Sequence, residues 1–464
     1  MSRIVAAIAL LAALAGAAQA AAKPKPAPAK TKPAAAPVLS QANYRIDRYT
    51  LDNGLTVILH EDHSVPLVTT NMWYHVGSAR EKPGRTGFAH LFEHLMFMGS
   101  QHVKPGEFDD LLENAGGTNN GSTENDRTNY WINVPSNAIQ LALFLESDRM
   151  GFLLESMTPK TVDAQREVVK NERRQSFENR PYGQAELLLS ELLYPPDHPY
   201  HWPVIGFMSD LTAASYEDVV EFFKKYYAPS NASFVVAGDI DPVATRKLVE
   251  KWFSDVKPGE PVAKLTAPPV ALTGVTKRTI TDKVQLPRIY VAWLTPPHFA
   301  PGDAALDMVA DALAGSKNSR LYKRLVYDMQ IAQDVVAYQN SQQLSSYFLI
   351  QATARPGHTA DELLKVIDEE VAKLQRETPP ARETQRSINS IEASFLRRLE
   401  RVGGFGGTAD QLNAYFTYTG NAGYFNQDLQ RYRSTTSADV RGAAAQYLPK
   451  DHRVELTVVP EGAK

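Results

Sequence analysis

Two histidines and a glutamate in the segment His90-Leu91-Phe92-Glu93-His94 have the types and the spacing for metal-assisted chemistry. Residues 84–98 are predicted as a helix, on which His90 and His94, four residues apart, project from one face. Two imidazoles at that spacing can hold one Zn²⁺, and a catalytic zinc site needs one further protein ligand and an open position. Glu93 stays close to the same face, where it could take a proton from zinc-bound water, whose pKa the metal lowers to about 7.

A third ligand must be His, Asp or Glu, because the chain has no cysteine. A helix is predicted over residues 159–178, and on it Glu172 shares one face with Val168 and Val169. A carboxylate on an otherwise apolar face needs a partner, since an unpaired buried charge is very costly. Glu172 is therefore the candidate, with Glu167 next. Two alternatives stay open: a solvated Glu172 beside the arginines that follow it, and a helix whose two histidines are purely structural.

The N-terminal residues 1–20 are typical of a secretory signal peptide. Arg3 precedes an apolar run, and Ala18-Gln19-Ala20 offers a cleavage site. A membrane anchor is the alternative, but the run of about 15 apolar residues is shorter than the ~20 that a span needs. Residues 21–43, rich in Pro, Ala and Lys, are predicted to be an extended tether. We expect export to the periplasm or the cell exterior, with no membrane span in the mature chain.

With 464 residues, the chain is long enough for two large units. Residues 44–256 gather predicted strands and then a run of helices, which indicates an α+β unit. Residues 257–276 are rich in Pro, Ala and Thr and are predicted to be a linker. Residues 277–464 are predicted as a second α+β unit that begins its folded part with a strand over 289–294. The net charge of −3 gives no support for nucleic-acid binding.

The second unit reads as a copy of the first. Tyr227-x-Pro229-x-Asn231 follows a predicted helix and leads into a strand, and Tyr447-x-Pro449-x-Asp451 repeats this pattern. The second copy holds no His-x-x-Glu-His, so the chemistry is expected in the first unit. Residues 403–407 are rich in glycine, but they follow a helix and lack a following Lys-Ser/Thr, so a break between two helices is favoured over a phosphate loop.

The chain resembles the pitrilysin/insulinase family of zinc metallopeptidases, in the branch that includes mitochondrial processing peptidase and its bacterial relatives. The resemblance covers Tyr44 to about Pro460 and rests on five motifs: Leu51–Leu55, Gly77–Gly99, Gly116–Thr123, Arg166–Arg174 and His198–Gly206. It implies two homologous α+β domains in tandem that form a half-clamp, and two half-clamps that enclose a peptide chamber. It also implies one Zn²⁺ per chain, held by His90, His94 and Glu172, with Glu93 as the general base.

The resemblance implies roles for further residues. Asn120 matches a residue that helps hold the substrate backbone along an edge strand. Gln165 stands where members often carry a second glutamate, seven residues before the ligand glutamate; it is expected to face the metal without adding negative charge. Members with both halves in one chain also carry an Arg and, seven residues on, a Tyr that reach the substrate from across the chamber. Here those positions hold Val326 and Gln333.

These residues together predict an exported zinc endopeptidase that cleaves peptides or small unfolded polypeptides. The expected assembly is a heterodimer with a homologous subunit that supplies the Arg–Tyr pair, and a homodimer is the alternative. The alternative function is a non-catalytic peptide-binding or assembly subunit with a vestigial zinc site.

Overall fold

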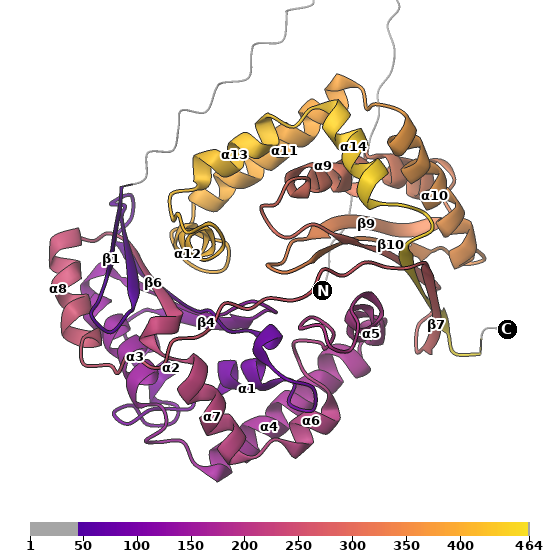
Figure 1. Ribbon diagram of the computed structural model, residues 1–464. Coiled ribbons are helices and arrows are strands. Elements are labelled where there is room, and N and C mark those ends of the chain that lie inside the picture. Colours follow the sequence, from indigo (N-terminus) through magenta and orange to yellow (C-terminus); the bar gives the residue numbers. More distant parts are fainter. Residues whose placement is uncertain (1–44, 463–464) are drawn as a thin grey trace, which may run out of the picture. The chain divides into compact units, whose positions relative to one another are not determined.

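The first half of the chain is built on a six-stranded sheet of order β1-β2-β6-β3-β5-β4 (Figure 1). β2 and β6 are parallel, and every other neighbouring pair is antiparallel. The computed structural model describes residues 45–462, so the predicted signal peptide and tether lie outside the described residues. The strands are β1 (Ile46–Thr50), β2 (Thr56–Glu61), β3 (Leu67–Tyr74), β4 (Thr118–Thr123), β5 (Thr128–Pro135) and β6 (Ala232–Gly238).

Helices of the same half cover one face of this sheet. Buried side chains from helices α1, α4, α7 and α8 join those of the strands in one apolar core. A π-helix over Arg174–Glu178 directly follows α4. The helices are α1 (Phe88–Leu95), α2 (Glu107–Asn114), α3 (Ile139–Phe152), α4 (Pro159–Arg173), α5 (Gly183–Leu193), α6 (Met208–Ala213), α7 (Tyr216–Tyr226) and α8 (Pro242–Phe253).

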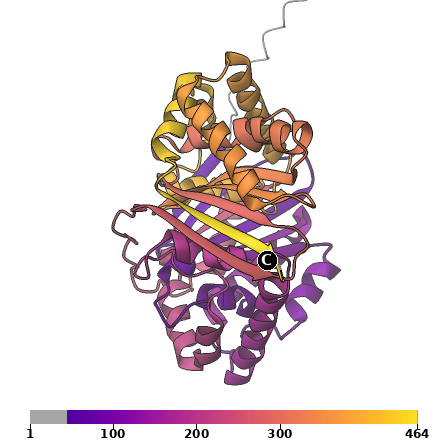
Figure 2. The ribbon, with the colours of Figure 1, turned by 90° about the vertical axis from the view of Figure 1, so that its right-hand side faces the viewer.

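The second half repeats this arrangement in a five-stranded sheet of order β7-β11-β8-β10-β9 (Figure 2). β7 and β11 are parallel and the other neighbours are antiparallel, so the sheet matches β2-β6-β3-β5-β4 strand by strand. The predicted α+β duplication is therefore confirmed, with β1 as an addition. The strands are β7 (Val275–Asp282), β8 (Arg288–Thr295), β9 (Ala332–Asn340), β10 (Ser346–Ala354) and β11 (Arg453–Pro460).

The helices of the second half are α9 (Asp303–Ala314), α10 (Ala360–Arg376), α11 (Ala381–Leu399), α12 (Thr408–Thr419), α13 (Phe425–Arg433) and α14 (Ser437–Tyr447), and a π-helix spans Tyr322–Asp328. None of the helices within residues 45–462 has the length and apolar character needed to cross a membrane.

Each sheet is also covered on its second face by a helix from the other half. Helix α12 packs on β6 and β3 of the first sheet, and helix α5 packs on the second sheet (Figure 1). The strand residues alternate accordingly: Phe234 and Val236 face the first core, whereas Val235 and Ala237 face α12. The described residues form one compact unit, so the predicted boundaries at residues 256 and 277 stay predictions.

Polar side chains fix α12 to the first sheet. The carboxylate of Asp410 accepts hydrogen bonds from Trp73 Nε1 and Asn129 Nδ2, both at 2.9 Å. Asn413 donates to the backbone carbonyl of Asn71 at 2.8 Å. Buried polar groups need such partners, because an unpaired one costs about 1–3 kcal/mol. These hydrogen bonds therefore define one position for α12 on the sheet.

The glycine-rich segment lies where α11 gives way to α12, so the predicted break between two helices is confirmed. It packs closely on the first sheet: a Cβ on Gly403 would clash with both Asn133 Oδ1 and Thr69 Oγ1. We expect Gly403→Ala to lower the free energy of unfolding by about 1–3 kcal/mol, the usual cost of overpacking, measured by chemical denaturation. Gly442→Ala is the matched control, because nothing lies within 4 Å of its Cβ position; an equal loss in both variants would contradict the prediction.

Strand β7 was not predicted. It begins at Val275, inside the last two residues of the predicted linker, and most of its side chains are exposed. An edge strand of Thr, Lys and Arg has no alternation of buried apolar residues to reveal it. Its position depends on parallel pairing with β11, which is far away in sequence.

Candidate metal centre

Helix α1 carries His90 and His94, and a buried carboxylate holds its first turn. Glu81 accepts hydrogen bonds from the backbone N–H groups of Gly87, at 2.9 Å, and Ala89, at 2.8 Å. These are among the donors that a helix start leaves without partners. Gly87 has a φ of 87°, so the helix begins only after it, at Phe88, and not at residue 84 as predicted.

Helix α4 carries Glu172 and is fixed near both ends. At its start, Thr158 Oγ1 accepts a hydrogen bond from the N–H of Thr161 at 3.2 Å, which is an N-cap. Near its end, Arg173 donates to the carbonyl of Gly206 at 2.6 Å. Because α4 also packs against α1, the Glu172 carboxylate is placed opposite the two histidines.

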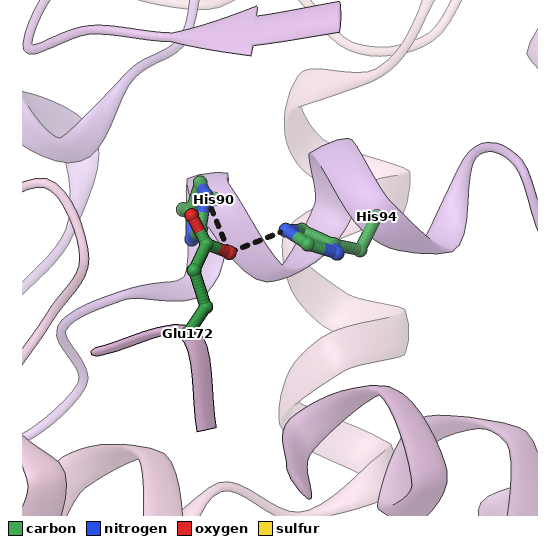
Figure 3. A group of neighbouring side chains, drawn as sticks. All are labelled: His90, His94 and Glu172. Carbon is green, nitrogen blue, oxygen red and sulfur yellow. Dashed lines mark ion pairs between the residues drawn. The ribbon is translucent and has the colours of Figure 1, made fainter. Parts of the chain in front are cut away.

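The side chains of His90, His94 and Glu172 converge on one point (Figure 3). Glu172 Oε2 lies 3.2 Å from His94 Nε2 and 3.7 Å from His90 Nε2. Ligand atoms about 2.1 Å from a tetrahedral zinc ion are roughly 3.4 Å apart, so these separations fit that ion. Within residues 45–462 no other group of three or more such side chains could hold a metal ion.

The electrostatics favour a metal-binding state at neutral pH. Burial, with a contribution from the charge of His94, lowers the pKa of His90 to about 4. Its ring is therefore neutral at pH 7, the form that binds zinc. The hydrogen bond with His94 lowers the pKa of Glu172, which keeps that carboxylate ionised. Side-chain exposure rises from 12% at His90 to 37% at Glu172, so the group is open to solvent on the side of Glu172.

Glu93 lies beside these residues on α1 and faces β4. Its Oε2 accepts a hydrogen bond from Thr123 Oγ1 at 2.7 Å. Burial raises the pKa of Glu93, and a carboxylate with a raised pKa is a stronger proton acceptor. This arrangement suits a general base.

Strand β4 passes the metal centre as the last strand of its sheet, paired only with β5. Its other edge therefore offers unpaired backbone N–H and C=O groups to an extended peptide. Asn120 is exposed on this strand, and its Oδ1 accepts a hydrogen bond from the N–H of Gly121 at 2.8 Å. The predicted contact of Asn120 with substrate backbone stays a prediction.

The remaining candidates on α4 are Gln165 and Glu167. Gln165 donates to Met98 Sδ at 2.7 Å, and it makes no hydrogen bond to His90, whose Nδ1 is buried without a partner among the described residues. Glu167 is exposed and pairs with Lys170 at 2.7 Å, away from the metal centre. Val168, expected on an apolar face, is 45% exposed, because it lies one turn before Glu172 on the open side.

The second half offers no unpaired arginine at or beside positions 326 and 333, where the resemblance led us to look for the Arg and the Tyr. Val326 lies in the π-helix Tyr322–Asp328 and packs against the second core, whereas Gln333 is exposed on the edge strand β9. The neighbouring Arg320 is paired with Glu383 at 2.8 Å. Arg324 pairs with two further glutamates of α10.

Two residues around the metal centre were missed by sequence reasoning. Glu81 and Thr123 reach α1 from other segments, and helical spacing carries no signal for such contacts. Both lie in motifs quoted above, Glu81 in Gly77–Gly99 and Thr123 in Gly116–Thr123, and these motifs were the available signals.

The fold and the site define a duplicated α+β protein with a His-His-Glu group suited to zinc. The family profile described as Insulinase (Peptidase family M16) matches residues 56–194, which include all three of these side chains. The profile described as Peptidase M16 inactive domain matches residues 213–391. The chain belongs to peptidase family M16, and the resemblance seen in its sequence is confirmed.

Two curated relatives illustrate the similarity. The zinc protease PqqE of Helicobacter pylori is 31% identical over 363 residues, covering 76% of this chain and 79% of that protein. The probable mitochondrial-processing peptidase subunit beta of Arabidopsis thaliana is 24% identical over 380 residues, covering 78% of this chain and 69% of that protein.

Solved structures share the fold. The crystal structure of a protease from Helicobacter pylori matches with a TM-score of 0.83 and 26% identity, covering 90% of this chain and 100% of that one. The first half of the periplasmic protease PqqL from Escherichia coli matches with a TM-score of 0.73 and 17% identity, covering 89% of this chain and 92% of that one. Against full-length PqqL the match covers 47% of that chain.

Proposed function

We propose that the chain is a zinc-dependent endopeptidase that cleaves peptides or small unfolded polypeptides, exported to the periplasm or the cell exterior. The observation that carries the proposal is the convergence of His90, His94 and Glu172 beside Glu93, next to the free edge of β4. The names of the relatives as zinc proteases support it. Export is supported by the signal-peptide pattern of residues 1–20 and would place the mature N-terminus near Ala21, which N-terminal sequencing would reveal.

The chain's own residues have separate parts in the reaction. Zinc held by His90, His94 and Glu172 would polarise the scissile carbonyl and acidify a bound water. Glu93 takes the proton from the attacking water and returns it to the amine nitrogen as the C–N bond breaks. The edge of β4 holds the peptide extended by main-chain hydrogen bonds, which select little for side chains, and Asn120 contributes to this contact.

The test is a zinc measurement combined with peptide cleavage by the purified protein. We expect about one zinc per chain by elemental mass spectrometry and cleavage of an unfolded polypeptide or a quenched fluorescent peptide. A chelator should stop cleavage and added Zn²⁺ should restore it. Peptide binding without cleavage in the zinc-loaded protein would favour the alternative, a non-catalytic peptide-binding subunit.

We further propose that the working enzyme is a heterodimer with a homologous subunit that supplies an arginine and a tyrosine, with a homodimer as the alternative. Val326 and Gln333 cannot offer those groups, and Arg320 and Arg324 are already engaged in ion pairs. A tyrosine hydroxyl and an arginine would bind the charge that develops on the scissile carbonyl oxygen. The match to about half of full-length PqqL is in keeping with a chain that forms one half of a larger enclosure.

This assembly predicts low activity for the isolated chain. Adding the homologous subunit should raise kcat/KM by at least about 100-fold, the cost of one missing oxyanion donor. Activity would be measured with and without that subunit, and the mass by light scattering. Full activity of a lone monomer or homodimer would contradict the heterodimer.

A further inference from the structure

One hydrogen bond reaches Glu93 from outside its own helix. Thr123, the last residue of β4, donates from Oγ1 to Glu93 Oε2 at 2.7 Å. Within residues 45–462 no other side chain donates a hydrogen bond to this carboxylate. A distance of 2.7 Å is typical of a hydrogen bond from a hydroxyl to a charged carboxylate, which is roughly twice as strong as a neutral one. The contact is therefore a specific interaction of Glu93.

Strand β4 lies against Glu93 over more than this one contact. Gly121 precedes Thr123 by two residues, so both lie on the same face of the strand. A Cβ on Gly121 would lie 3.1 Å from Glu93 Cγ and 3.3 Å from the ring of Phe97. The buried glycine thus lets the strand approach α1 closely enough for the Thr123 hydroxyl to reach the carboxylate.

The Thr123 hydroxyl is also held in place. Thr123 pairs with Thr128 of β5 in antiparallel register, and its β-branched side chain has few χ1 rotamers. Arg127 secures the turn that follows, because it donates to the carbonyl of Ser122 at 2.8 Å and to the carboxylate of Glu124 at 2.6 Å. The donor is therefore in position before any substrate binds.

From this geometry we propose that Thr123 is a positioning residue for Glu93, a role that rests on the proposed function. Its hydrogen bond occupies Oε2 and fixes the rotamer of the carboxylate. Oε1 is then the oxygen that takes the proton from the attacking water and later gives it to the leaving amine nitrogen. Because Thr123 acts on the base and not on the peptide, its loss affects the chemical step and leaves peptide binding intact.

Thr123→Val removes the hydroxyl and keeps the shape and the preference for a strand, whereas Thr123→Ser keeps the hydroxyl. We expect kcat of Thr123→Val to fall about 10- to 100-fold, as for a lost hydrogen bond to a charged group. KM, zinc content and the melting temperature should stay close to wild type, and Thr123→Ser should keep most of the activity. Thr50→Val is the matched control, since Thr50 is exposed on β1 at the opposite edge of the same sheet.

Wild-type kcat in Thr123→Val would overturn this assignment and leave the proposed function standing. Loss of zinc in Thr123→Val, or equal impairment of the Ser and Val variants, would overturn it too, because either result marks a purely structural role. A wild-type protein that binds zinc and cleaves no peptide, either alone or with the homologous subunit, would overturn the proposed function, and with it the assignment.

Discussion

Glu93→Gln is expected to keep the fold and the zinc of the wild-type protein and to lower kcat for peptide hydrolysis by roughly 10²- to 10⁴-fold, the usual contribution of a general base. The amide has the shape of the carboxylate and can still form a hydrogen bond with Thr123, which donates to Glu93 at 2.7 Å. It cannot take a proton from water. The loss should therefore appear in kcat alone.

Glu167→Gln is the matched control for this substitution. Glu167 is exposed on α4 and pairs with Lys170, so the same change of carboxylate to amide should leave kcat unaltered. Zinc content by elemental mass spectrometry and the melting temperature establish that both variants are intact. Turnover at the wild-type rate by zinc-loaded Glu93→Gln would remove Glu93 from the mechanism.

Glu172→Ala and His94→Ala are each expected to lose zinc as well as activity, because each removes one of the three proposed protein ligands. The fall in zinc affinity should exceed the roughly 10- to 100-fold that accompanies loss of a residue that only orients a ligand. Among the described residues, Glu172 forms ion pairs only with His94, at 3.2 Å, and His90, at 3.7 Å, so the helix should remain folded without it.

Zinc competition with a coloured chelator would measure the affinities, with circular dichroism as the check on folding. Glu167→Ala is the control on the same helix and also tests the other glutamate considered as a ligand. Full zinc occupancy in Glu172→Ala would move the third ligand elsewhere, and zinc loss in Glu167→Ala would point to that residue.

The parts of the fold that follow from local pattern were predictable. The antiparallel hairpin β1–β2 is of this kind, because Asn53-Gly54 between its strands is typical of a tight turn. The helix of the metal motif was placed too long at both ends, since Gly87 takes a positive φ and the helix stops at Leu95. Strand β7 was missed because its exposed residues carry no apolar period and its pairing partner follows much later.

The candidate site likewise has features that follow from local pattern and features that do not. His90 and His94 are related by one helical turn, so their convergence could be read from spacing. The approach of Glu172 needed the family motif, because the packing of α4 on α1 is tertiary. That Gln165 faces the metal stays a prediction. The contact of its amide with Met98 was not foreseen, because a helical period cannot tell which neighbour a side chain meets. The same limit hid Thr123.

The exchange of α5 and α12 between the two halves has a consequence for folding during synthesis. The first half is made first, but one face of its sheet is covered by α12, which ends at Thr419. Until that residue has left the ribosome, apolar side chains such as Ile58 and Val235 lack the helix that covers them. Helix α5 likewise packs against β11, which is translated near the end of the chain. The second face of each sheet is therefore not covered early, so the chain reaches its native state only once almost all of it has been translated.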